Sequence, residues 1–178
     1  MKGTPLIRPV TMDDAEAIRS IYNYYIERTP ISFEEMPVTR REMAERIRSV
    51  TASFPWYACE EAGEILAYAY MHPFRERSAY RFTLEDSIYV RHDAFRRGFG
   101  RTLLARLLAD LAGKDIHSVI AAITIPNEPS VVLHQAFGFK KIGHLREVGY
   151  KFDRWIDVGY WEYLTGKDRK LGNAETLP

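Results

Sequence analysis

The sequence predicts one domain of mixed α/β class in which strands outnumber helices. The chain has 178 residues, 46% of them hydrophobic, which suits a single domain with one continuous core. Seven stretches are rich in β-branched and aromatic residues, and four others carry apolar residues at helical spacing. We expect the domain to cover residues 1–165 and the polar residues 166–178 to form a C-terminal tail.

The N-terminal half predicts three strands and two helices. A strand is expected in 6–11, and a helix follows Thr11, which has Asp14 three residues on. A second helix is expected over 39–50, because Thr39 and Glu42 have the spacing of a capping box. Strands over 56–61 and 65–73 flank the turn at 61–64.

The C-terminal half predicts four strands and two helices. A long β-type run covers 80–91 and precedes a glycine-containing turn and a leucine-rich helix. The stretch 117–124 is apolar on both faces, as expected of a central strand. A helix then follows with Pro129 in its first turn and Gly138 at its end, before two strands joined by a turn.

Composition restricts the class of protein. Lys and Arg number 25 against 24 Asp and Glu, a formal net charge of +1, whereas proteins that wrap nucleic acid are usually far more basic. The start of the chain lacks the apolar core of a signal peptide, and no apolar stretch approaches the ~20 residues that span a bilayer. Cys59 is the single cysteine, so no intrachain disulfide can form. We expect a soluble cytoplasmic protein with no nucleic-acid or membrane partner.

The stretch RRGFGR, residues 96–101, predicts an anion site. It opens the leucine-rich helix, whose first-turn N–H groups and dipole favour negative charge, and its glycines allow the main chain to come close to a ligand. The Walker pattern is absent, and Leu103 stands where a dinucleotide fingerprint needs its third glycine. A solvated basic helix start is the alternative interpretation.

The segments EDSIYV, RRGFGR and NEPSVVLHQAFGFKKIG together resemble the acyl-CoA-binding core of the GCN5-related N-acetyltransferases (GNAT). The segments IYNYYIERTPISFEE, RSAYRFTLEDSIYV and GYKFDRWIDVGYWE extend the resemblance to nearly the whole chain, closest to phosphinothricin and methionine sulfoximine acetyltransferases. The resemblance implies the GNAT fold: a mixed, mostly antiparallel sheet of about seven strands, about four helices, and a splay between the fourth and fifth strands.

The resemblance also implies acetyl-CoA as acetyl donor. Its pyrophosphate would lie on the turn, and its pantetheine arm would pair with the main chain of a β-bulge at 87–90. Phe95 departs from the family's usual Gln or Arg, so a side-chain contact is lost there. The cofactor-binding residues implied are Ile88, Tyr89, Val90, Arg96, Arg97, Gly98, Phe99, Gly100, Arg101, Asn127 and Ser130.

Acetyl transfer to an amine needs a base, a donor for the carbonyl oxygen and a route for a proton to the thiolate. Glu85 matches the glutamate that similar enzymes use as base, and burial would raise its pKa. Asp86 is expected on the opposite side by strand alternation. The Val90 N–H is the expected oxyanion donor. His134 stands where most of the family has tyrosine, and its pKa range suits a proton donor, although a polar contact is the alternative.

The acceptor site is expected near Arg75, Arg77 and Tyr80, just before the strand that carries Glu85, with Phe33 as a wall. Paired arginine forks suit a substrate carboxylate or phosphinate, so a small amino acid or analogue is the expected acceptor. The histidines show no metal-ligand spacing, and we predict no metal. The resemblance implies a homodimer, with Trp155 and Tyr160 at its interface or in the pocket. The alternatives are acetylation of a peptide N-terminus or another metabolite, a nucleic-acid-binding module, and a non-catalytic acetyl-CoA sensor.

Overall fold

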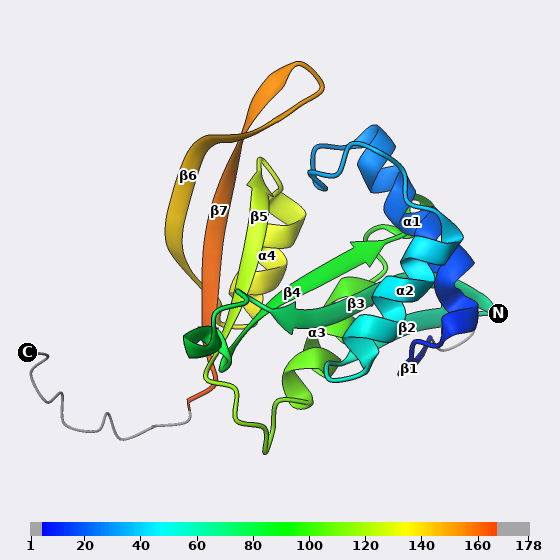
Figure 1. Cartoon of the computed structure of the whole chain (residues 1–178), viewed down its shortest axis with the longest axis horizontal. Coiled ribbons are helices and arrows are strands. Elements are labelled where there is room, and N and C mark those ends of the chain that lie inside the picture. The colour runs from blue at the N-terminus through cyan, green and yellow to red at the C-terminus, as the bar shows by residue number, and fades with distance from the viewer. Residues whose placement is uncertain (1–4, 167–178) are drawn as a thin grey trace, which may run out of the picture.

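A seven-stranded sheet in the order β1-β2-β3-β4-β5-β7-β6 runs through the computed structural model, which describes residues 5–166 (Figure 1). Neighbouring strands are antiparallel except β4 and β5, which are parallel. The strands are β1 Leu6–Pro9, β2 Trp56–Glu61, β3 Glu64–Pro73, β4 Thr83–Val90, β5 Ser118–Ile125, β6 Lys140–Lys151 and β7 Arg154–Leu164. The helices are α1 Ala15–Arg28, α2 Arg40–Thr51, α3 Phe99–Ala109 and α4 Glu128–Ala136. The predicted fold class is confirmed, and the tail beyond residue 166 lies outside the described residues.

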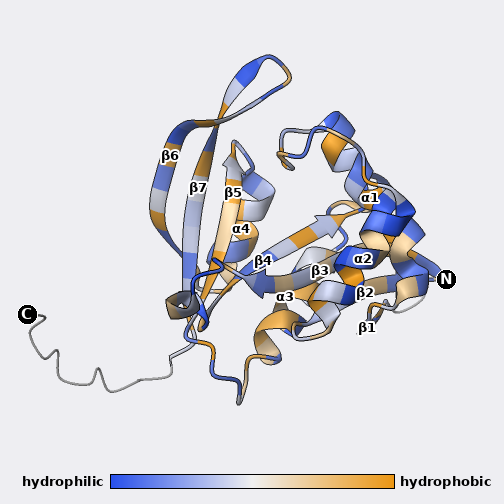
Figure 2. Cartoon of the chain, viewed as in Figure 1, coloured by the Kyte–Doolittle hydropathy of each residue, from blue (hydrophilic) through white to orange (hydrophobic). Residues whose placement is uncertain are grey.

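Two hydrophobic clusters cover the two faces of the sheet. On one face α1 and α2 pack through Ile18, Ile26 and Ile47, all at most 1% exposed, against aromatic side chains of β2 and β3. On the other face α3 buries Leu103 and Leu104 completely. Strand β5 is hydrophobic along most of its length, whereas β6 carries many hydrophilic residues (Figure 2). None of the helices within residues 5–166 is both long and apolar enough to cross a membrane.

Strands β4 and β5 pair over only three residues and then separate. Thr83, Leu84 and Glu85 of β4 lie opposite residues 118–120 of β5, while β5 stays paired with β7 along its full length. Beyond Glu85 the two strands diverge, as Figure 1 shows. This divergence, called here the β4–β5 gap, confirms the predicted splay.

Two details of β4 differ from the sequence-based predictions. The strand begins at Thr83 rather than near residue 80, because Ser78–Tyr80 form a 3-10 turn in which the N–H of Tyr80 bonds to the carbonyl of Arg77 at 2.9 Å. The bulge expected at 87–90 is absent, since β4 pairs with β3 in one uninterrupted register from Leu84 to Val90. The separation from β5 therefore comes from the path of the strands and needs no inserted residue.

The loop between α1 and α2, residues 29–39, is held in place by a buried amide. The side chain of Asn23, 7% exposed, donates to the carbonyl of Val38 and accepts from its N–H, both at 3.0 Å. The Thr39–Glu42 capping box predicted from the sequence then starts α2. The loop is thus fixed at the end that leads into α2.

We predict that Asn23→Ala lowers the free energy of unfolding by about 2 kcal/mol, because both main-chain groups of Val38 lose their partner in a buried position. Urea unfolding followed by circular dichroism measures this. Glu45→Ala, at an exposed position of α2, is the control and should change little. Equal stabilities for the two variants would show that the amide bonds do not hold the loop.

Candidate active site

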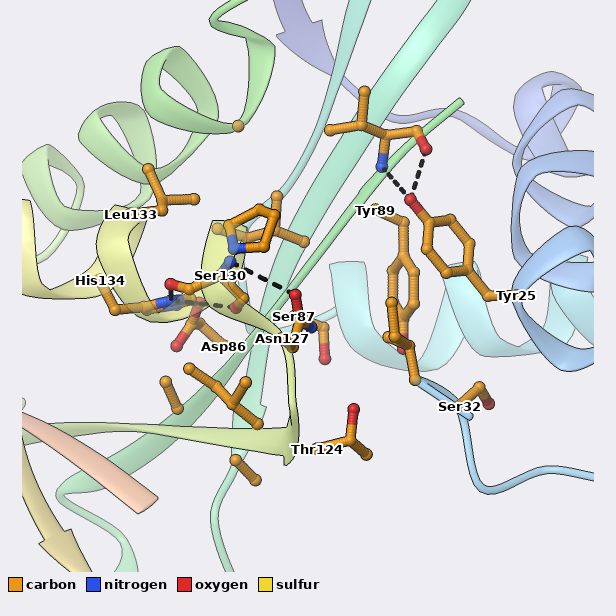
Figure 3. Close-up of a pocket in the computed structure, with 18 of the residues that line it drawn as sticks. Tyr25, Ser32, Asp86, Ser87, Tyr89, Thr124, Asn127, Ser130, Leu133 and His134 are labelled. Atoms are coloured by element: carbon orange, nitrogen blue, oxygen red, sulfur yellow. Dashed lines mark hydrogen bonds and ion pairs between the residues drawn. The ribbon is translucent and has the colours of Figure 1, made fainter. Parts of the chain in front are cut away.

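A cavity of about 1160 Å³ passes through the β4–β5 gap. It runs from the turn between β4 and α3, past the N-terminal end of α4, to α1 and the 29–39 loop. Figure 3 shows Asp86, Ser130 and His134 gathered on one side of it and Tyr25, Tyr89 and Ser32 on the other. One cavity therefore connects the two faces of the sheet.

Side-chain alternation along β4 sends neighbouring residues to opposite faces. The ring of Tyr89 lies 5.1 Å from those of Tyr22 and Tyr25, on the α1 face. Glu85 shares that face, because it is four residues from Tyr89. Asp86 instead meets His134 of α4. The expected opposition of Glu85 and Asp86 is present, one on each side of the gap.

The predicted anion turn has the geometry of a main-chain site. Gly98 caps α3 at φ 85°, and a Cβ placed on it would meet nothing within 4 Å. Arg96 also adopts a positive φ, 61°. Gly98, Phe99 and Gly100 line the cavity, so the first turn of α3, with its unpaired N–H groups, borders space that a phosphate could fill.

The arginines of the turn are engaged to different degrees, although Arg96, Arg97, Phe99 and Arg101 all line the cavity. Arg97 pairs with Glu61 and lies over the Phe99 ring. Arg101 lies over the ring of Phe137. The main chain, rather than Arg97, is thus the better-placed anion partner.

The main chain of Val90 already has a partner. The hydroxyl of Tyr25 donates to the Val90 carbonyl at 2.5 Å and accepts from its N–H at 3.3 Å. The next N–H, of Arg91, points the other way and bonds to Leu66 of β3. Because main-chain groups alternate along an antiparallel strand, Ile88 presents its N–H and carbonyl to the gap, whereas Tyr89 directs its own to β3. The N–H of Val90, predicted as a donor, is therefore already bonded, whereas the N–H of Ile88 faces the gap.

His134 and Asp86 form a buried pair, with His134 only 4% exposed and Asp86 7%. The ring Nε2 lies 3.0 Å from Asp86 Oδ2, and Nδ1 lies 2.7 Å from the Ser130 carbonyl, to which it donates. Burial works against the charged ring, but the hydrogen bond and charge of Asp86 outweigh it, so the pKa of His134 is raised. Both ring nitrogens are occupied, which leaves none free for the thiolate in this arrangement.

Asn127 and Ser130 position the start of α4. Asn127 is its N-cap and accepts from the N–H of Ser130 at 3.4 Å, and both residues line the cavity. On the same side of the β4–β5 gap, the second carboxylate oxygen of Asp86, Oδ1, is buried and has no hydrogen bond within the described residues.

Burial raises the pKa of Glu85. The positive charges of His72, its cross-strand neighbour, and Arg75 oppose this shift, and the charge of Asp86 adds to it. A carboxylate with a raised pKa at the wall of a cavity is the arrangement that general bases use.

The predicted acceptor residues divide into two groups. Phe33 lines the cavity. Arg75, Arg77 and Tyr80 are exposed and do not line it. The Arg75 guanidinium lies over the Phe74 ring, 4.1 Å from its centroid, and the Tyr80 ring packs on the same phenylalanine. Arg75 and Tyr80 thus pack on Phe74 outside the wall, and neither Arg75 nor Arg77 lies in the pocket lining in this arrangement.

The acceptor side of the cavity includes residues that sequence reasoning missed. They come from α1, β3, the 29–39 loop and the last three strands: Tyr22, Tyr70, Ser32, Glu34, Thr124, Leu145, Val148 and Val158. Tyr160, considered for the pocket or an interface, lies with them, whereas Trp155 does not line the cavity and is 61% exposed. Thr124 and Val158 lie side by side because β5 pairs with β7, and a sequence pattern does not reveal which strands pair.

Comparison with known proteins agrees with this geometry. A family model described as an acetyltransferase (GNAT) domain matches residues 7–159. The chain belongs to this family. A phosphinothricin N-acetyltransferase of Streptomyces viridochromogenes is 39% identical over 88% of this chain and 85% of its own. An L-methionine sulfoximine/L-methionine sulfone acetyltransferase of Pseudomonas paraeruginosa is 34% identical over 88% and 92%.

A solved structure of a similar protein contains acetyl-CoA. The phosphinothricin acetyltransferase of Sinorhizobium meliloti in complex with acetyl-CoA superimposes with a TM-score of 0.87, at 32% identity, over 91% of this chain and 89% of its own. The residues present here fit that molecule, because the turn at Gly98 is open and Ile88 presents its main chain to the gap. Within residues 5–166 no group of three or more His, Cys, Asp and Glu side chains is placed to hold a metal.

We predict that Asp86→Asn lowers the pKa of His134, since the carboxylate's hydrogen bond and charge are what raise it. Titration of the histidine ring resonances by NMR measures the change, and the resonances of the other histidines report whether the fold is kept. An unchanged titration of His134 would contradict the assigned pair.

Proposed function

We propose that the protein transfers an acetyl group from acetyl-CoA to the α-amine of a small amino acid or analogue, with Glu85 as general base. The observation that carries the proposal is the cavity through the β4–β5 gap, which joins an anion-binding turn on one face to a half-buried carboxylate on the other. A donor entering from the turn and an amine entering past Glu85 would meet in the gap.

The chain's own groups bind the donor at two places. The main chain of the turn around Gly98 holds the pyrophosphate, with Arg96 and Arg101 at its edge, and Ile88 pairs with the pantetheine arm while Asn127 and Ser130 face it. Bound there, acetyl-CoA supplies an acetyl group activated as a thioester. The N–H of Ile88 is the donor that we assign to the carbonyl oxygen.

Glu85 removes the proton that an attacking amine must lose. Burial raises the pKa of Glu85 toward that of the amine, and a base whose pKa is closer to that of the proton donor accepts the proton more readily. Asp86 and His134 lie on the donor side and keep α4 against β4. We assign His134 to holding this side in place, because both of its ring nitrogens are bonded.

The acceptor class follows from the relatives, which are named for phosphinothricin and for methionine sulfoximine and sulfone. We propose the same type of acceptor here. Arg75 is the arginine that we propose for the acceptor carboxylate, because its charge acts on Glu85 and Arg77 is not among the groups that shift the pKa of Glu85. Its guanidinium lies over Phe74 outside the cavity wall, so it would turn into the pocket when the acceptor binds. The exposed apolar side chains near the β6–β7 turn, among them Trp155 and Phe152, support the homodimer that we propose for the assembly.

We predict that acetyl-CoA at 100 times its dissociation constant adds about 2.7 kcal/mol to the free energy of unfolding. Gly98→Val should lose this effect, because its side chain would enter the open space over the turn. Gly113→Val is a matched control with the same kind of strain, since Gly113 has φ 82°, an equally open Cβ position and no place in the cavity wall. Thermal unfolding with NAD and ATP as negative ligands decides the assignment. Equal responses of both variants to acetyl-CoA would place the donor elsewhere.

Glu85→Gln should keep the affinity for acetyl-CoA and lower kcat/KM by roughly 10²–10⁴, the usual contribution of a positioned base. The loss should shrink at high pH, where the free amine is already neutral. In the wild type, kcat/KM should fall as the pH drops through the raised pKa of Glu85, because protonation removes the base. A thiol-release assay across pH tests this, and wild-type rates in the variant at pH 7 would move the base to another residue.

Arg75→Ala should raise KM for phosphinothricin or methionine sulfone several-fold and leave KM for acetyl-CoA unchanged, because only the acceptor loses a charge partner. Arg77→Ala is the matched control in the same loop and should have the smaller effect. A preference of the wild type for polyamines, or a larger effect at Arg77, would overturn the acceptor model.

A further inference from the structure

The turn end of β6 contacts the 29–39 loop across the acceptor end of the cavity. Lys151, the last residue of β6, is 5% exposed, and its Nζ donates to the carbonyls of Ser32 at 2.7 Å and Glu34 at 2.8 Å. Figure 1 shows the β6–β7 turn and the loop after α1 at the same end of the molecule. The buried ammonium group of Lys151 thus donates to the two carbonyls on either side of Phe33.

The same loop segment is fixed from the opposite side. The hydroxyl of Tyr22 lies 2.8 Å from Glu34 Oε1 and 3.1 Å from Ser32 Oγ. Arg46 of α2 donates to both carboxylate oxygens of Glu34. Ser32 and Glu34, on each side of Phe33, are therefore held by α1 and α2 through their side chains and by β6 through their main chain.

The ring of Phe33 lies against Gly149 of β6. A Cβ placed on Gly149 would lie 2.3 Å from the ring, far closer than side-chain atoms approach one another. Gly149 is buried in β6, opposite Ile156 of β7, and has no positive φ. Its lack of a side chain is explained by the ring that lies on it and not by backbone conformation.

We propose that Gly149 and Lys151 determine which acceptors are accepted, by holding the Phe33 ring as the end wall of the acceptor pocket. The inference rests on the proposed function, since it concerns the same pocket. The ring lines the cavity together with Val148 and Leu145 of β6, so its position limits how far an acceptor side chain can extend. Side chains of the length of methionine sulfone fit short of the wall, and bulky aromatic amino acids are excluded by it.

The ring can be displaced without touching Phe33 itself. A methyl group at position 149 must move the ring, and the ring is free to move outward because Phe33 is 43% exposed. Gly149→Ala should therefore behave as Phe33→Ala does. In the double variant no ring remains to be displaced, so the two changes should not add.

The test is a double-mutant cycle read as kcat/KM for methionine sulfone and for phenylalanine, with KM for acetyl-CoA measured alongside. Gly149→Ala and Phe33→Ala should each reduce the preference for methionine sulfone over phenylalanine about 10-fold or more, the range that hydrophobic pocket contacts provide, with acetyl-CoA unaffected. Gly143→Ala is the matched control in β6, because its Cβ would meet only Tyr160 at an ordinary 3.9 Å. Lys151→Met should shift the preference in the same direction, and Lys151→Arg, which keeps a donor, should restore part of it.

Two results would overturn the inference: additive effects of Gly149→Ala and Phe33→Ala, or an unchanged preference in Gly149→Ala. Failure of the proposed function is a separate result, seen when the wild type acetylates no amino acid. In that case a crystal structure of Gly149→Ala decides the inference without turnover. It should show the Phe33 ring displaced from β6, and a ring left in place would refute the positioning.

Discussion

The site depends on how briefly β4 and β5 pair. Main-chain N–H and carbonyl groups of a strand need partners, and pairing that stops after Glu85 leaves the rest of the β4 edge without β5. At Val90 the tyrosine hydroxyl of α1 provides the substitute, whereas at Ile88 the main chain faces the cavity. An unpaired strand edge beside a large cavity is the kind of surface that chain-like ligands with amide groups of their own pair with in other proteins.

The two faces of β4 place the two carboxylates of the site in different surroundings. Glu85 faces the tyrosines of α1 and β3, where burial raises its pKa, and Asp86 faces α4, where His134 satisfies one of its oxygens. A shift of one residue in the register of β4 would exchange these two carboxylates. The uninterrupted pairing of β4 with β3 prevents that exchange. The register of the strands therefore determines which carboxylate faces which side of the gap.

Local signals predicted the fold class and the turn at Gly98, because these depend on neighbours in sequence. The Thr39–Glu42 capping box, the turn at Gly98 and the end of α4 at Gly138 are each read from a few adjacent residues. The lining of the cavity near α1 depends on contacts between distant segments, which local patterns in a sequence do not show. No local pattern shows that Arg75 lies over the ring of Phe74, outside the cavity wall. Nor does one show that Lys151 binds a loop more than a hundred residues away in the sequence.

We propose that donor and acceptor meet inside the β4–β5 gap. A crystal structure of the protein with coenzyme A and an acceptor amino acid tests it most directly. The account predicts pyrophosphate on the turn at Gly98, pantetheine beside Ile88, the sulfur within the gap, and the acceptor nitrogen in hydrogen-bond reach of Glu85, directly or through one water. Pantetheine on another surface, or an acceptor nitrogen on the Asp86 side of the sheet, would contradict it.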